Sequence, residues 1–177
     1  MPDGLGAPLA APLFQRLALI GVGLIGSSIA RVARRKRLVG SIVAADSSEE
    51  VRKRVEELGL ADSMARSTAA AVENADLVIL CVPVGAMGEV AQEIGPHLRP
   101  GAIVTDVGSV KGAVIAAVAK HLPSGVHFVP GHPVAGTEQS GPEAGFATLF
   151  RKRWCILTPP EGTDSKAVAR LAEFWTA

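Results

Sequence analysis

The sequence has little of what marks disulfide-rich, membrane-spanning or nucleic-acid-binding proteins. Its 177 residues contain two cysteines, Cys81 and Cys155, both inside apolar runs, so we expect buried free thiols rather than a disulfide or a metal site. No apolar stretch is long and uncharged enough to span a membrane. The formal net charge is only +1, which indicates neither nucleic acid nor an anionic membrane as a partner.

The N-terminal stretch also lacks a signal. Residues 1–15 contain three prolines and no cationic region before their apolar part, so we expect a disordered tail rather than a signal peptide. The remaining residues, 16–177, are long enough for one domain with a substantial core. With 48% hydrophobic and 20% charged residues, the composition is typical of a cytoplasmic globular domain.

The most informative segment lies between residues 17 and 46. An apolar run is followed by Gly21-x-Gly23-x-x-Gly26, a helical stretch, and a second short strand that ends in Asp46. This order is the dinucleotide-binding fingerprint: the first glycine permits a tight turn, the second admits a pyrophosphate, and the third lets the helix pack on the strand. The helix N-terminus offers free N–H groups to the phosphates. Asp46 stands where a carboxylate binds the adenosine ribose, so the spacing predicts a nucleotide site.

The rest of the chain alternates between strands and helices. Apolar runs predict further strands over residues 77–82, 102–106, 126–130 and 153–158, and helices over 48–58, 110–121 and 165–176. Ser48 is the expected N-cap of the first of these helices, and Gly59 its stop. Six strands with helical crossovers predict an α/β fold with a Rossmann-type, doubly wound and mainly parallel sheet.

Three polar segments begin where predicted strands end. They start at Cys81-Val82-Pro83, at Thr105 to Gly112, and at Gly131 to Gly141. Ligands of such sheets bind outside the carboxyl ends of the strands, so these segments are expected to meet in one crevice. The third contains His132 between a glycine and a proline, and the coincidence of all three indicates a site.

Together the motifs GVGLIGSS, VPV, DVGSVKG and GHPVAGTEQSG resemble the prephenate/arogenate dehydrogenase family of tyrosine biosynthesis. The resemblance runs from about Leu17 to the C-terminus, and the segment around His132 is its most diagnostic part. It implies oxidative decarboxylation: a hydride passes from the hydroxyl-bearing ring carbon to a nicotinamide, and the ring carboxylate leaves as carbon dioxide. Prephenate would yield 4-hydroxyphenylpyruvate and arogenate tyrosine, and the sequence leaves both substrates open.

The resemblance also assigns roles to residues. His132 matches the catalytic histidine, whose imidazole suits proton transfer near neutral pH. Ser109 matches a serine near the nicotinamide and that histidine; its alternative role is to cap the following helix. Thr137 and Glu138 match substrate-side positions. Cofactor binding is assigned to Gly21, Gly23, Leu24, Ile25, Gly26, Asp46, Val82, Pro83 and Ser109, and substrate binding to Ser109, His132, Thr137 and Glu138.

Two neighbours of these residues are expected to play lesser parts. Asp106 is interpreted as a cap or brace of its loop and not as catalytic. Lys111 is interpreted as a solvated lysine in the first turn of a helix, with the supply of positive charge to the site as its alternative role. The cations between Arg31 and Arg37 are expected to stabilise the C-terminal end of the first helix rather than to bind nucleic acid, because no aromatic residues interleave with them.

Asp46 predicts NAD rather than NADP, because a carboxylate accepts ribose hydroxyls and repels a 2′-phosphate. Ser47 and Ser48 follow it where NADP-binding proteins often have an arginine. Arg52 and Arg54 lie close behind and keep NADP open as the alternative.

Length is the main departure from the family pattern. Family members continue into a helical domain that supplies much of a dimer interface and part of the substrate site, whereas this sequence ends at Ala177. We therefore expect an isolated nucleotide-binding domain that is weakly active or inactive alone, in a protein that is a homodimer when complete. Leu171, Phe174 and Trp175 of the last helix are expected to be exposed in its absence.

Two other functions fit the early glycine motif. One is a different Rossmann-type hydroxyacid or imine reductase, and the other is a non-catalytic NAD-binding module. Activity on prephenate that depends on His132 would distinguish the dehydrogenase from both.

Overall fold

A computed structural model describes residues 11–177 of the chain. Most of the tail expected over residues 1–15 lies outside the described residues. Strand β1 (Phe14–Ile20) nevertheless starts within that range, and its first side chain, Phe14, is fully buried. The sheet therefore begins two residues before the expected boundary at residue 16. None of the helices in residues 11–177 is long and apolar enough to cross a membrane.

The main sheet has six strands in the order β3-β2-β1-β4-β5-β6, and every neighbouring pair is parallel. This is the doubly wound Rossmann order, and it confirms the predicted fold class. The order reverses between β1 and β4, which places the crevice for a ligand at their carboxyl ends. The other strands are β2 (Val39–Ala45), β3 (Ser63–Met64), β4 (Leu77–Leu80), β5 (Ile103–Asp106) and β6 (His127–Phe128).

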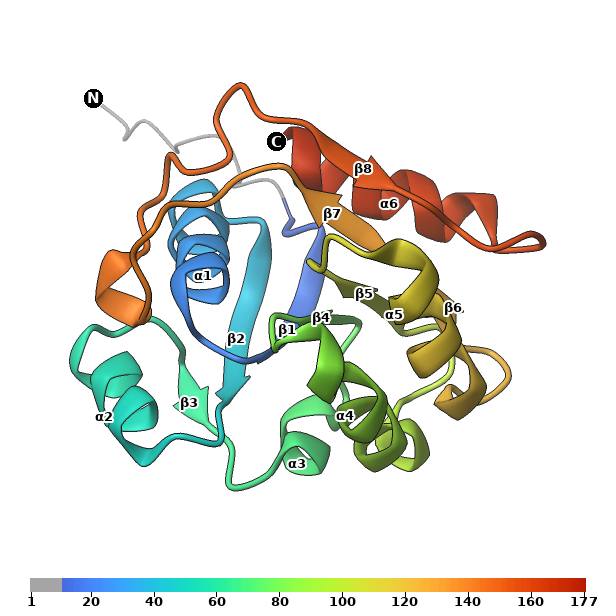
Figure 1. Ribbon diagram of the computed structural model, residues 1–177, viewed down its shortest axis with the longest axis horizontal. Helices are drawn as coiled ribbons and strands as arrows, with labels where there is room; N and C mark the ends of the chain where they lie inside the picture. Colours follow the sequence, from blue (N-terminus) through green and yellow to red (C-terminus); the bar gives the residue numbers. More distant parts are fainter. Residues whose placement is uncertain (1–10) are drawn as a thin grey trace, which may run out of the picture.

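Helices cover both faces of this sheet (Figure 1). Along β1, Leu17 and Leu19 belong to the core that packs with α1, α2 and α6, whereas Ala18 and Ile20 face the core of α3, α4 and α5. The helices are α1 (Leu24–Lys36), α2 (Glu49–Glu57), α3 (Thr68–Val72), α4 (Met87–Ile94), α5 (Lys111–Val118) and α6 (Ser165–Thr176). Short 3₁₀ turns are η1 (Val84–Ala86), η2 (Gly95–His97), η3 (Ala119–His121) and η4 (Pro142–Ala144).

The expected sixth strand, residues 153–158, does not join the main sheet. Its central part, β8 (Cys155–Leu157), pairs antiparallel with β7 (Gly131–Pro133) in a separate two-stranded sheet. The sixth place is taken by β3, a two-residue edge strand that pairs with β2. The predicted number of strands in the main sheet is therefore right, but one of the six is a different segment. The sequence did not indicate β3, because it has no apolar run.

Helix α6 packs against the core of the domain, contrary to the exposure expected for its apolar residues. Leu171 is fully buried, Phe174 is 4% exposed, and Trp175 is half-buried. The ring of Phe174 lies edge-on to that of Phe14, with 6.1 Å between centroids, and Trp175 lies edge-on to Phe150. The amphipathic face of α6 thus finds its partner within this domain, at the first strand.

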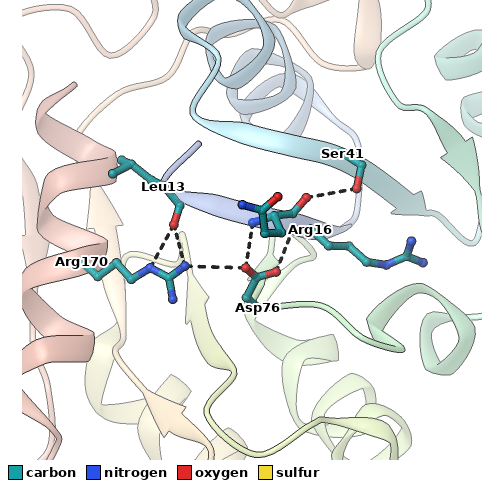
Figure 2. Close-up of polar contacts among 6 residues, drawn as sticks. Leu13, Arg16, Ser41, Asp76 and Arg170 are labelled. Atoms are coloured by element: carbon teal, nitrogen blue, oxygen red, sulfur yellow. Dashed lines mark hydrogen bonds and ion pairs between the residues drawn. The ribbon is translucent and has the colours of Figure 1, made fainter. Parts of the chain in front are cut away.

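Polar contacts fix α6 to the start of β1 (Figure 2). Arg170 donates from Nε and Nη2 to the carbonyl oxygen of Leu13 at 3.0 and 2.6 Å, and its guanidinium stacks on the Phe14 ring. The carboxylate of Asp76, only 3% exposed, accepts hydrogen bonds from the backbone N–H groups of Gln15 and Arg16, both at 2.7 Å. This corner therefore joins the segment before β4, strand β1 and α6.

Replacement of Asp76 by alanine is expected to lower the free energy of unfolding by about 3 kcal/mol, because two partly buried N–H groups lose a charged acceptor. Urea unfolding would measure the change. Asp76→Asn retains one acceptor oxygen and is expected to lose about half as much. Equal stability of the alanine variant and the unsubstituted chain would contradict this assignment.

Candidate functional site

The loop after β1 has the geometry that the three glycines predict. Gly21 has φ +87°, and a Cβ there would meet the Cys81 backbone at 2.9 Å. A Cβ on Gly26 would lie 2.3 Å from the Gly21 carbonyl oxygen, so α1 packs directly on the loop. Around Gly23 there is open space, and α1 begins there without a side-chain cap. Its first N–H groups are available to a phosphate, so the loop fits a dinucleotide.

Asp46 lies at the end of β2, beside the glycine loop. Its Oδ2 accepts the N–H of Val22 and its Oδ1 that of Ser48, both at 2.9 Å. A carboxylate has about four acceptor positions, so two remain for ribose hydroxyls. Arg52 donates to the carbonyl oxygens of Asp46 and Ser47 at 2.8 and 2.9 Å, which holds the turn in place.

The loop ends of the neighbouring strands meet at the same edge. The N–H of Cys81 donates to the Ile20 carbonyl oxygen at 2.7 Å, so the segment that contains Val82 and Pro83 lies directly beside the glycine loop. Val82 also touches that loop, because its Cγ1 lies 3.0 Å from the position of a Cβ on Gly21. The structure thus brings the first of the three predicted segments, which starts at Cys81, together with the glycine loop at the switch point.

His132 lies on β7 at the carboxyl end of β5. It is opposite Ile156 of β8, and its side chain is half-buried. Its Nδ1 is buried and has no hydrogen-bond partner among residues 11–177. The register of β7 and β8 places His132 on one face of this sheet, together with Ile156 opposite it and the next opposed pair on that face, Val134 and Trp154. These three side chains therefore flank the imidazole. These three apolar residues are 50, 45 and 82% exposed, so the histidine lies on an open apolar surface.

The strongest polar cluster near His132 was only partly expected. Asp106 is fully buried; its Oδ2 accepts the N–H of Gly108 and the ammonium of Lys111, and its Oδ1 accepts the N–H of Gly131. The role of Asp106 as a brace is confirmed. Lys111 is not solvated as expected: its side chain is 14% exposed and also donates to the Gly131 carbonyl oxygen at 2.6 Å. In the sequence, the spacing Asp-x-x-x-x-Lys at the start of a helix was the signal that could have indicated this ion pair.

The remaining predicted residues lie in exposed loops. Ser109 is exposed, and it does not cap α5, which begins with Val110 at its N-cap position and no side-chain cap. Thr137 and Glu138 are also exposed; the hydroxyl of Thr137 accepts the N–H of Gln139 at 3.2 Å. No hydrogen bond joins these three residues to His132 within the described part of the chain.

The loop that carries Thr137 and Glu138 continues across α1 to α2, an arrangement the sequence did not reveal (Figure 1). Phe146 donates its N–H to Ser28 Oγ at 3.1 Å, and Glu143 of η4 forms an ion pair with Arg54. A Cβ on Gly145 would lie 2.0 Å from the hydroxyl oxygen of Ser27, so the loop lies directly on α1. In the sequence, this contact with α1 was indicated only by Gly145, a glycine within an apolar stretch.

The two cysteines are free and half-buried. Burial raises the pKa of both thiols, that of Cys155 to about 12, so both are protonated at neutral pH and are poor nucleophiles. In residues 11–177 no group of three or more His, Cys, Asp or Glu side chains is placed to hold a metal ion.

Comparison with known proteins finds one family model that matches most of the chain. Residues 29–177 match the family described as Prephenate dehydrogenase, nucleotide-binding domain. Cyclohexadienyl dehydrogenase of Zymomonas mobilis is 45% identical over 163 residues, which are 92% of this chain and 55% of that protein. D-apionate oxidoisomerase of Cupriavidus necator is 37% identical over 139 residues, 73% of this chain and 46% of that protein.

Among solved structures, prephenate dehydrogenase from Aquifex aeolicus in complex with hydroxyphenyl propionate and NAD⁺ matches with a TM-score of 0.85. It is 34% identical, and the match covers 96% of this chain and 58% of that one. The chain thus spans about half the length of the curated relatives it matches.

Proposed function

We propose, from the premise that this chain belongs to the family of prephenate dehydrogenase nucleotide-binding domains, that it is the cofactor-binding half of an NAD-dependent prephenate dehydrogenase. The observation that carries the proposal is the position of His132. Gly131, the residue before His132, donates its N–H to the carboxylate of Asp106, which lies at the end of β5 in the main sheet. A proton-transfer group therefore lies at the same sheet edge as the glycine loop.

The proposed reaction is the oxidative decarboxylation of prephenate to 4-hydroxyphenylpyruvate. Bound NAD⁺ supplies the acceptor for the hydride that leaves the hydroxyl-bearing ring carbon. His132 holds that hydroxyl and takes its proton as the carbon becomes sp². Because Nδ1 is buried, Nε2 is the nitrogen left to accept the proton. The electrons of the bond to the ring carboxylate aromatise the ring as carbon dioxide leaves, and the resulting phenolate takes the proton back from His132.

The other proposed residues are assigned to the binding of NAD⁺ and of the substrate. We assign the pyrophosphate to Gly21, Gly23 and Gly26 with the adjoining Leu24 and Ile25, the ribose to Asp46, and the nicotinamide end to Val82, Pro83 and Ser109. Ser109, Thr137 and Glu138 are proposed to contact the substrate. Their exposure supports this role, because all three side chains are free to meet a ligand.

We propose that NAD is preferred to NADP. The Asp46 carboxylate faces the turn where the ribose is expected, and the two arginines nearby are engaged, Arg52 by backbone carbonyls and Arg54 by Glu57 and Glu143. A 2′-phosphate would meet the fixed negative charge of Asp46, and the charge of Arg54 is already paired with two carboxylates.

Asp46→Asn is expected to raise the Kd for NAD⁺ about tenfold and to narrow the preference for NAD⁺ over NADP⁺, because the amide removes the negative charge and one acceptor. Calorimetric titration of both cofactors would measure this. Glu49→Gln, an exposed acid in the first turn of α2, is the matched control and should change neither Kd. Tighter binding of NADP⁺ than NAD⁺ by the unsubstituted chain would overturn the assignment.

We further propose that a segment corresponding to the part of the longer relatives that this chain does not cover forms a helical domain, and that this domain completes the substrate site and a homodimer. The open apolar surface of Val134, Trp154 and Ile156 beside His132 supports this, because such patches are rare on the surface of a complete monomer. Arogenate remains the alternative substrate, since residues of that domain are expected to contact the part in which the two substrates differ.

The decisive experiment is an assay of NADH formation with prephenate and then arogenate. It compares this chain with a form extended by the segment that its relatives have, and with His132→Ala in that form. Turnover only in the extended form, and its loss in the variant, is the expected result. NAD⁺ binding without turnover of either substrate would favour a different oxidoreductase, a possibility raised by the 37% identical D-apionate oxidoisomerase, or a non-catalytic NAD-binding module.

A further inference from the structure

The buried ion pair of Asp106 and Lys111 has no part in the reaction described above. Asp106 is fully buried, and the Lys111 side chain is 14% exposed. Charges in such surroundings are costly unless they are paired and their hydrogen bonds are satisfied, and a purely stabilising role is often served as well by apolar residues. A pair retained beside the proposed catalytic histidine therefore calls for a specific explanation.

The two members of the pair hold the two peptide units on either side of Gly131, and the one bonded to Lys111 joins Gly131 to His132. Asp106 Oδ1 accepts the N–H of Gly131 at 3.2 Å, and Lys111 Nζ donates to the Gly131 carbonyl oxygen at 2.6 Å. Gly131 also packs closely on β5: a Cβ there would lie 3.1 Å from the Asp106 carbonyl oxygen and 3.1 Å from Thr105 Oγ1. The N–H of the residue that precedes His132 is thus fixed to the end of β5, and its carbonyl oxygen to the start of α5.

The imidazole of His132 has no comparable support of its own. Its Nδ1 has no hydrogen-bond partner among the described residues, so the position of the ring depends on the backbone that carries it. On one side that backbone is held by β8, where His132 is opposite Ile156. On the other side it is held by the ion pair, through Gly131.

We infer that Lys111 is a positioning residue, which acts with Asp106 to hold the His132 imidazole at the carboxyl end of β5. This inference rests on the proposed role of His132 for its effect on turnover, but not for its effect on the ring itself. Loss of the Lys111 donor would release the carbonyl oxygen of the peptide that joins Gly131 to His132. Displacements of about 1 Å at a reacting group lower rates about 100-fold.

The test uses Lys111→Met, Lys111→Arg and the double variant Asp106→Asn/Lys111→Met. The double variant removes both buried charges, so it keeps the test usable if Lys111→Met fails to fold. In the extended form, we expect kcat for prephenate to fall about 100-fold in the folded variants without Lys111, with KM and the Kd for NAD⁺ within about threefold. Lys111→Arg should recover part of kcat, because its guanidinium can donate to both oxygens. Lys120→Met, at an exposed lysine, is the matched control.

A second readout needs no turnover. In NMR spectra of this chain labelled with ¹⁵N-histidine, the ring signals of His132 should shift or broaden in the Lys111 variants, while those of His97, His121 and His127 stay in place. Unchanged His132 signals and unchanged kcat would overturn the inference. A shifted His132 ring in a protein that oxidises neither substrate would instead leave the positioning role intact and count against the proposed function.

Discussion

Replacement of His132 by asparagine is expected to lower kcat for prephenate about 1,000-fold in the extended form, while the Kd for NAD⁺ stays within about twofold. Positioned general acid–base groups contribute about 10²–10⁴-fold to rates, and asparagine cannot take the hydroxyl proton. Asparagine is close to histidine in size, so the pairing of β7 with β8 should persist. The affinity for NAD⁺ should not change, because the glycine loop and Asp46 follow other strands, β1 and β2.

Steady-state kinetics with calorimetric titration of NAD⁺ would measure both quantities. His97→Asn is the matched control, because His97 is exposed on the turn after α4 and should tolerate the change without effect. A variant at position 132 that keeps a tenth or more of the activity would remove His132 from the mechanism. A parallel loss of NAD⁺ affinity would instead indicate that the substitution disturbs the sheet edge as a whole.

The parts of this fold that could be predicted from the sequence depend on local signals. Strand β4 is buried at all four of its positions and appears as an unbroken apolar run, as strands covered on both faces do. Ser48 caps α2 as predicted and accepts the N–H of Val51 at 3.3 Å. Gly59 has φ +61°, which suits a residue just beyond the end of a helix.

The parts that could not be predicted depend on which distant segment a residue meets. Residues 155–157 have the apolar character of a strand, but their pairing with β7 is decided by the path of the long loop between them. Leu171 and Phe174 give α6 an apolar face, and the periodicity does not say that β1 rather than another domain covers it. Strand β3 consists of two residues and has no pattern to detect.

The candidate site also has residues that local signals could place and residues that they could not. The glycines and Asp46 could be placed because the turn, the helix start and the strand end lie within one short stretch of chain. Lys111 could not, since its burial depends on the return of Gly131 to the end of β5. The sequence predicts Ser109 near the nicotinamide and the histidine, or as the cap of the following helix, and in this structure its side chain is exposed and does not cap α5.

The glycine loop gives the second large expected effect, because two of its glycines are required for different reasons. Gly23→Ala adds a methyl group where no protein atom lies within 4 Å, at a backbone conformation that alanine adopts readily. We expect the free energy of unfolding to change by no more than about 1 kcal/mol, the cost of a poorer N-cap residue. The Kd for NAD⁺ should nevertheless rise about 100-fold, because the methyl group occupies the space proposed for the pyrophosphate.

Gly26→Ala is expected to behave differently. Its methyl group would lie 2.3 Å from the Gly21 carbonyl oxygen, a backbone atom that cannot move aside cheaply, so α1 must shift away from the sheet. We expect a loss of about 2–4 kcal/mol in the free energy of unfolding together with the loss of NAD⁺ binding. Urea unfolding and calorimetric titration on both variants would separate the two roles. Because only a bound ligand can make Gly23 necessary, an unchanged Kd in a stable Gly23→Ala chain would show that the pyrophosphate does not lie against this turn.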